Sequence, residues 1–217
     1  MTDEQLRCLM VAIAEGDESP VRQALHENPE LAAAAIEHDA LRADPAPPVL
    51  QRLSCYLYRG DTALHVAAAA HRPEMVSLLL DLGADVAAGN RRGTTSLHGA
   101  AAGSPEASGD DHEAQIATIG VLLAAGADPE ASNFDGATAL HRAIRSRCSV
   151  AVAALLEAGA SPARPNGNGS SPMKLATQAT GRGGSGSPAA KREQAAIIQL
   201  LSDSASLLAA ADSVDRD

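Results

Sequence analysis

The sequence predicts an all-α solenoid of helix–turn–helix units joined by finger-like β-turn loops. Four glycines at positions 60, 93, 136 and 169 are separated by 33, 43 and 33 residues, a period typical of repeat architectures. They begin the related motifs GDTALHVAAAA, GTTSLHGAAAG, GATALHRAIRS and, in weakened form, GSSPMKLATQA. The 217-residue chain is 45% hydrophobic but has no Trp, one Phe and two Tyr. An apolar, aromatic-poor composition of this kind favours helices with small side chains packed in thin layers.

Within each unit the sequence predicts a short first helix, a turn and a second helix. In the unit that begins at Gly60, the apolar residues Met75, Leu78, Leu79 and Leu82 recur at helical spacing and predict one buried face. The first helices are rich in alanine, which lets neighbouring units approach closely. The second helices are followed by glycines that suit a left-handed helix end, at Gly83, Gly126 and Gly159.

These motifs resemble the ankyrin repeat family, whose signature is T-P-L-H-x-A with a period of 33 residues. The resemblance covers residues 60–201 strongly, and residues 4–33 resemble a degenerate first repeat. The matching positions are Thr62, Leu64 and His65, then Thr95, Leu97 and His98, then Thr138, Leu140 and His141, with Ala63, Ser96 and Ala139 in place of the proline. The resemblance implies a module that holds a partner protein, and structural histidines that tie adjacent repeats together.

One such unit cannot bury its own apolar face, so neighbouring units supply the core and the terminal units act as caps. We therefore divide the chain into about five units and their extensions. The expected segments are a degenerate N-terminal capping repeat at 1–33, a finger insertion at 34–59, repeats at 60–92, 93–135 (with an inter-helix insertion) and 136–168, a C-terminal capping repeat with a Gly/Ser-rich loop at 169–205, and a tail at 206–217.

Charge and composition exclude several classes of partner. The 17 basic and 27 acidic side chains give a net charge of −10, and a nucleic-acid partner would need a basic face. No apolar run approaches the length of a membrane span, and the polar start MTDEQLRC lacks the apolar segment of a signal peptide. The three cysteines form no CxxC pair. We expect a cytoplasmic protein without a nucleic-acid or membrane partner, and the excess of arginine over lysine favours a bacterial origin.

Three insertions depart from the repeat and are predicted to form loops. Residues 34–59 lengthen a finger and contain both tyrosines; their apolar stretch LQRLSCYLY argues against a disordered linker. Residues 103–113 separate two helices, and their Asp-Asp-His-Glu run is interpreted as an acidic helix start rather than a metal site. Residues 180–188, TGRGGSGSP, form either a flexible connector or an anion cradle of backbone N–H groups.

The first functional hypothesis is a protein-binding module that holds a partner protein on its concave face and finger tips. Phe134 is the only phenylalanine and stands at a predicted finger tip, where an aromatic side chain serves as an anchor. The candidate partner-binding residues are Tyr56, Tyr58, Asn90, Arg91, Arg92, Asn133, Phe134 and Asp135. A variant of this hypothesis is an inhibitor or antitoxin-like protein whose wide acidic surface binds a basic protein.

The alternative hypothesis is a small-molecule-binding protein or enzyme, with a pocket closed by the insertions 34–59, 103–113 and 180–188. Arginines gather at the predicted helix-to-helix turns, and guanidinium groups suit the carboxylate or phosphate of an acidic small molecule. They can equally pair with the many nearby carboxylates. The candidate anion-binding residues are Arg72, Arg145, Arg147, Arg182, Gly183 and Ser185.

Enzymatic activity is left open by the sequence, and the default expectation is a protein that is not an enzyme. The chain contains no GxSxG, HExxH or dinucleotide-binding motif, and no cofactor or metal is expected. If a pocket forms, His71, His112 or Tyr56 are the candidates for moving a proton. Cys148 follows Arg147, which would favour its thiolate, but no histidine base adjoins it.

Overall fold

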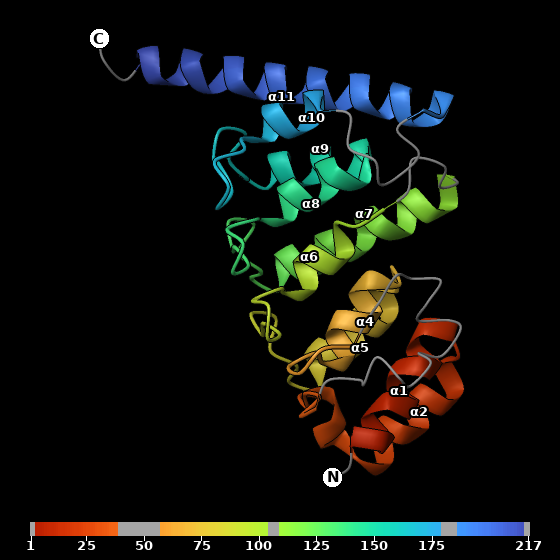
Figure 1. Cartoon of the computed structure of the whole chain (residues 1–217). Coiled ribbons are helices and arrows are strands. Elements are labelled where there is room, and N and C mark those ends of the chain that lie inside the picture. Colours follow the sequence, from red (N-terminus) through yellow and green to blue (C-terminus); the bar gives the residue numbers. More distant parts are fainter. Residues whose placement is uncertain (1–2, 39–56, 104–108, 179–185, 215–217) are drawn as a thin grey trace.

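The computed structural model describes residues 3–38, 57–103, 109–178 and 186–214. Its helices form pairs that stack one upon the next from the N-terminus to the C-terminus (Figure 1). The first pair is α1 (Asp3–Glu15) and α2 (Glu18–Glu27), followed by the 3-10 helix η1 (Pro29–Ala32). The later pairs are α4 (Ala63–Ala69) with α5 (Pro73–Asp81), α6 (Ser96–Ala100) with α7 (Gly109–Ala124), α8 (Ala139–Ser146) with α9 (Ser149–Glu157), and α10 (Pro172–Thr177) with α11 (Pro188–Val214). The predicted all-α solenoid is confirmed.

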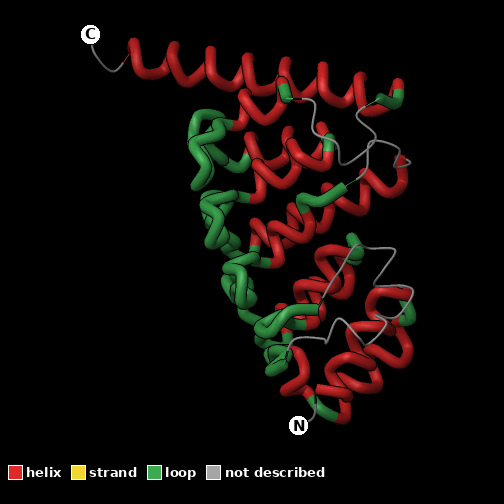
Figure 2. Tube along the Cα trace, in the orientation of Figure 1, coloured by secondary structure: helices red, strands yellow, loops and turns green. Residues whose placement is uncertain are grey.

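The two long edges of the stack differ in structure. Loops that lead from one pair to the next line one edge, as Figure 2 shows, and we call this the finger edge (residues 58–61, 89–95, 132–138 and 165–170). Two of these loops fold back on themselves through antiparallel bridges, between Gly89 and Thr95 and between Ser132 and Thr138. Turns within each pair form the opposite edge, which we call the helix-turn edge (residues 16–17, 70–72, 101–103, 147–148 and 178).

Each first helix of the three central pairs begins with a reciprocal cap. The Thr62 side chain accepts a hydrogen bond from the backbone N–H of His65, and the His65 ring accepts one from the backbone N–H of Thr62. The same arrangement joins Thr95 to His98 and Thr138 to His141. Because the first N–H groups of a helix have no partner inside it, these caps determine where the helices begin.

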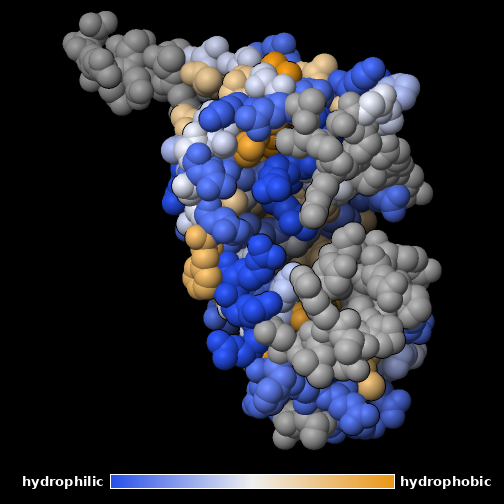
Figure 3. All heavy atoms as spheres, in the orientation of Figure 1, coloured by the Kyte–Doolittle hydropathy of each residue, from blue (hydrophilic) through white to orange (hydrophobic). Residues whose placement is uncertain are grey.

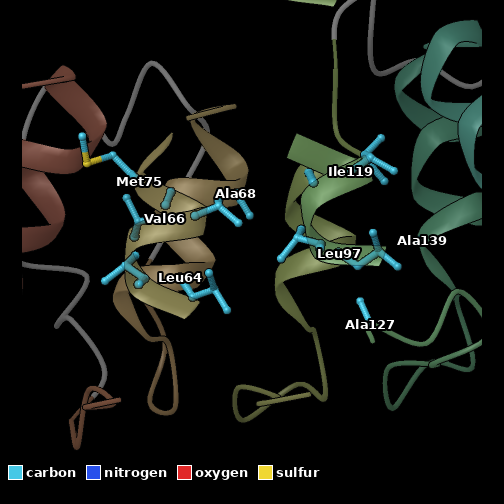
Figure 4. Close-up of a cluster of buried hydrophobic side chains, with 14 of the residues drawn as sticks. Leu64, Val66, Ala68, Met75, Leu97, Ile119, Ala127 and Ala139 are labelled. Atoms are coloured by element: carbon cyan, nitrogen blue, oxygen red, sulfur yellow. The ribbon is translucent and has the colours of Figure 1, made fainter. Parts of the chain in front are cut away.

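A continuous hydrophobic core runs through the stack, from Leu6 of α1 to Leu201 of α11. Leucines at equivalent positions of successive first helices are fully buried, at Leu64, Leu97 and Leu140. Figure 4 shows this core where α4 and α5 meet α6 and α7. Small residues permit the close approach, since a Cβ added to Gly99 would lie only 3.4 Å from the carbonyl oxygen of His65. Each buried leucine contributes about 1.5–3 kcal/mol of transfer free energy.

Two segments that depart from the regular repeat are helical, and the acidic helix start predicted at the Asp-Asp-His-Glu run is confirmed. α7 begins at Gly109, so the later residues of the predicted insertion 103–113 wind the first turn of a 16-residue helix, whereas α5 and α9 have 9 residues each. Asp111 lies in that first turn, where a carboxylate interacts favourably with the helix dipole. α11 continues to Val214, so the predicted boundary at residue 205 does not coincide with a helix end. Leu207 and the alanines that follow are strong helix formers.

Candidate functional site

Neighbouring finger tips are joined by backbone hydrogen bonds. In each of these bonds, a backbone N–H of one tip donates to a backbone carbonyl oxygen of the preceding tip. These bonds join Arg91 to Arg59 (N···O 2.7 Å), Phe134 to Arg92 (2.9 Å) and Gly167 to Asp135 (2.9 Å). Because the tips are fixed relative to one another, the side chains that they carry form a preorganised surface.

The asparagines at the finger tips shape the loops from within. The Asn90 side chain is buried: its Oδ1 accepts from the backbone N–H groups of Arg92 (2.9 Å) and Thr94 (3.2 Å), and its Nδ2 donates to Asp61 (2.8 Å). Asn133 Oδ1 accepts equivalent bonds from backbone N–H groups in its own finger. Both were predicted to contact a partner, but their side-chain oxygens are occupied inside the finger. Asn166 plays the same part in the next finger and was missed, although the pattern NRRG, NFDG, NGNG carried the signal.

Two arginines and a tyrosine form a cluster on the finger edge. The guanidinium carbons of Arg91 and Arg92 lie 5.0 and 5.6 Å from the centre of the half-buried Tyr58 ring. Both distances fall within the range of a cation–π interaction. Arg92 also pairs with Asp135 at 3.6 Å, across side chains that are 53% and 69% exposed. An exposed pair of this kind contributes at most about 1 kcal/mol and leaves both groups accessible to a partner. Tyr56, which was predicted to bind a partner, lies outside the described residues.

Phe134 stands out among the finger residues because it is 81% exposed. One edge of its ring rests against Gly93, where an added Cβ would meet Cδ1 at 3.0 Å. Position 93 favours glycine for two reasons. Its φ of 69° is one that side chains with a Cβ rarely adopt, and the Phe134 ring occupies the space that a Cβ would need. Figure 3 shows a largely hydrophilic surface along this edge, interrupted by a hydrophobic protrusion.

The histidines of the repeated motif connect one repeat to the next. His65 Nε2 lies 2.9 Å from the carbonyl oxygen of Thr94, and His98 Nε2 lies 2.9 Å from that of Ala137. In both rings Nδ1 receives a backbone N–H, so Nε2 carries the proton and donates it. Burial lowers the pKa of His98, which favours this neutral form. The structural role that the family resemblance implied for these histidines is confirmed. His141 forms the same cap, but its Nε2 makes no well-aligned hydrogen bond; the carbonyl groups of Ser170 and Arg164 only partly offset the lowering of its pKa by burial.

The predicted anion-binding arginines do not gather at one point. The Arg72 guanidinium lies against Gly16 in the first pair, because a Cβ added there would be 2.9 Å from Arg72 Cζ. Arg147 turns towards the last pair, where its Nη2 donates to the carbonyl oxygen of Gln178 at 3.1 Å. Arg145 is exposed on the last turn of α8. The remaining candidates, Arg182, Gly183 and Ser185, lie outside the described residues.

The candidate proton-transfer groups are mostly used in structural contacts. His71 Nε2 lies 3.1 Å from the carbonyl oxygen of Ala100, and burial lowers the pKa of His71. His112 is half-buried, and its Nε2 has no hydrogen-bond partner. The Cys148 thiol lies 3.0 Å from Gln115 Oε1, and burial raises the pKa of Cys148. A buried thiol with a raised pKa is a poor nucleophile. These contacts do not place a nucleophile beside a base.

Comparison with known families identifies the chain. A model described as ankyrin repeats in three copies matches residues 9–108, and a model of a single ankyrin repeat matches residues 135–167. Together they cover well over half of the sequence, so this chain belongs to the ankyrin repeat family. Ankyrin repeats are in general protein-interaction modules.

No curated protein matches the chain. In the part of the chain that the structure describes, no helix combines the length and the apolar character that a membrane crossing needs.

Proposed function

We propose that this ankyrin repeat chain is a protein-binding module that holds its partner on the finger edge. The observation that carries the proposal is Phe134, a large apolar side chain that is 81% exposed within a row of hydrogen-bonded tips. Single exposed apolar residues are common on protein surfaces. Phe134 differs because its own N–H is held by Arg92, while the next residue, Asp135, is held by Gly167. Binding through a fixed aromatic side chain loses little conformational entropy.

The groups beside Phe134 define the chemistry of the partner. Arg91 and Arg92 are exposed and lie against Tyr58, which orients them. Aromatic and arginine side chains are the residues most often found at binding hot spots. A guanidinium group pairs best with a carboxylate. The finger edge therefore suits a protein with an apolar pocket for the Phe134 ring and carboxylates around it.

The charge of the partner distinguishes this proposal from the hypothesis of an inhibitor-like protein, in which a wide acidic surface would bind a basic partner. The chain as a whole has a net charge of −10, which would suit a basic partner. The exposed arginines of the finger edge favour an acidic one. Charge reversal of Arg91 and Arg92 distinguishes the two, because it weakens binding to an acidic partner and strengthens binding to a basic one.

The first test compares Phe134→Ala with Leu207→Ala. Leu207 is also a large apolar residue, 72% exposed, but it lies on α11 and not in a finger loop. The partner is identified by cross-linking to the full chain in its host, and the dissociation constants are measured by calorimetry. We expect Phe134→Ala to weaken binding by about 30-fold or more, the loss typical of a hot-spot residue, and Leu207→Ala to leave it unchanged. Equal affinities of wild type and Phe134→Ala would remove the basis of the proposal.

A further inference from the structure

Arg147 is the most unusual charged residue in the described part of the chain. It is 3% exposed and forms the C-cap of α8 in the left-handed conformation, with a φ of 57°. For a residue other than glycine, this conformation disfavours folding by a factor of about 5–30. A strained residue at a charged, buried position calls for a functional explanation.

The equivalent turns of other pairs show what the position requires. In the first pair it is occupied by Gly16, with a φ of 83°, which adopts this conformation freely. In the second pair it is occupied by His71, with a φ of 51°. His71 is explained by its hydrogen bond to the carbonyl oxygen of Ala100 in the next pair. Arg147 makes a similar bond to Gln178, but a neutral donor would serve that purpose as well.

The charge of Arg147 is not neutralised by any described residue. A guanidinium group has five N–H donors and stays protonated in proteins. One bond, to the carbonyl oxygen of Gln178, is formed, and Nε is buried without a partner. Among the described residues no carboxylate forms an ion pair with Arg147. The nearby carboxylate of Glu193 instead accepts the backbone N–H of Ser149, at 2.8 Å.

We propose that Arg147 is the anchor of a binding site for a small oxyanion at the helix-turn edge. Burying an unpaired charge is strongly unfavourable, and an anion removes that penalty. The guanidinium fork suits two oxygens of one phosphate or carboxylate group. Lys191 and Arg192 are exposed on the first turns of α11, and the neighbouring carboxylate of Glu193 is occupied by the backbone N–H of Ser149. The ligand class is therefore a phosphate- or carboxylate-bearing small molecule.

The experiment uses the full chain with inorganic phosphate and citrate as probes, at constant ionic strength. The test variant is Arg147→Gly, which removes the guanidinium and relieves the backbone. The matched control is His71→Gly, which relieves the backbone at the equivalent turn and leaves Arg147 in place. A third variant, Arg147→Lys, keeps a positive charge but not the fork. Thermal unfolding midpoints are recorded for all four proteins, and circular dichroism verifies their helix content.

We expect at least one probe to raise the midpoint of wild type and His71→Gly by about 5–10 °C at a hundred times its dissociation constant. The rise should be absent in Arg147→Gly and reduced in Arg147→Lys. Without a probe, Arg147→Gly should be more stable than wild type. A response to phosphate alone or to citrate alone assigns the ligand to the phosphate or the carboxylate class.

Two results would overturn the proposal. Equal shifts in all four proteins would show a general salt effect, and no shift in any of them would show that Arg147 takes neither anion. The outcome is independent of the finger edge, because Phe134→Ala leaves the helix-turn edge intact and should respond to the probes as wild type does.

Discussion

Replacing His98 with alanine measures how much of the stability depends on the hydrogen bond between adjacent repeats. The His98 side chain is buried, at 4% exposure. Its Nδ1 lies 2.9 Å from Thr95 Oγ1 and 3.2 Å from the Thr95 backbone nitrogen. On the other side of the ring, Nε2 donates to the carbonyl oxygen of Ala137 in the next repeat, 2.9 Å away. Alanine removes the half of the cap that the imidazole ring supplies, and also the inter-repeat bond.

The magnitude follows from these two losses, and His141 provides a matched control. Loss of a helix cap costs about 1 kcal/mol of unfolding free energy. The partly buried carbonyl oxygen of Ala137 loses its donor, and leaving such a group unsatisfied costs about 1–3 kcal/mol more. His141 forms the same cap with Thr138, but its Nε2 makes no well-aligned hydrogen bond to the next repeat of the kind that His98 makes. We therefore expect His98→Ala to destabilise the chain by about 1–3 kcal/mol more than His141→Ala does.

Urea unfolding followed by far-ultraviolet circular dichroism measures both variants against wild type. The dependence of the unfolding free energy on urea concentration should be the same in all three proteins. Differences in the midpoint urea concentration then report differences in stability directly. Loss of packing around the imidazole ring is common to both variants and largely cancels in the difference. If His141→Ala destabilises the chain as much as His98→Ala, the inter-repeat hydrogen bond is not the source of stability and the reasoning is refuted.

The remaining predictions concern pH and the finger glycines. Burial lowers the pKa of three histidines, His71, His98 and His141. The unfolded chain then binds more protons than the folded one, so stability is constant above about pH 7 and falls below it, by up to about 1.4 kcal/mol per pH unit for each histidine. Unfolding measured from pH 7.5 to 5 would contradict this if stability stayed level. Separately, Gly136→Ala should destabilise the chain by at least about 1 kcal/mol more than Gly126→Ala. Both glycines have positive φ, but only at Gly136 would the new Cβ meet backbone, 2.5 Å away; equal unfolding midpoints would contradict this.

The repeat period was sufficient to predict the helices and the fingers, and the family resemblance implied the role of the repeated histidines. Position within a repeat determines which residues face the core, because each unit buries its apolar face against its neighbours. It also placed Phe134 at a finger tip, where the structure has it largely exposed. Asn90 shows the limit of this reasoning, since its place at the tip was evident but its inward hydrogen bonds to Asp61 and the loop backbone were not.

The insertions and the arginines were harder to predict for a different reason. An insertion interrupts the period, so the period does not show where the next helix begins; here the acidic run indicated the helix start, and α7 begins at Gly109. A long arginine side chain can turn towards either neighbouring repeat. Arg72 turns towards Gly16 and Arg147 towards Gln178, and this choice depends on space and acceptors in the neighbours rather than on the local motif.

The two edges of the stack differ in the residues that occupy their left-handed turn positions. At the finger edge, asparagine and glycine satisfy the loop from within, and the strain is small because glycine occupies the left-handed positions. The Phe134 side chain at the tip remains largely exposed. At the helix-turn edge, glycine is retained at Gly16 but replaced by Arg147, which is strained and has a buried, unpaired charge. Stability alone would favour glycine at both places. Because this departure costs stability at one edge and not at the other, it supports the anion site that we propose there, separate from the protein-binding surface that we propose at the finger edge.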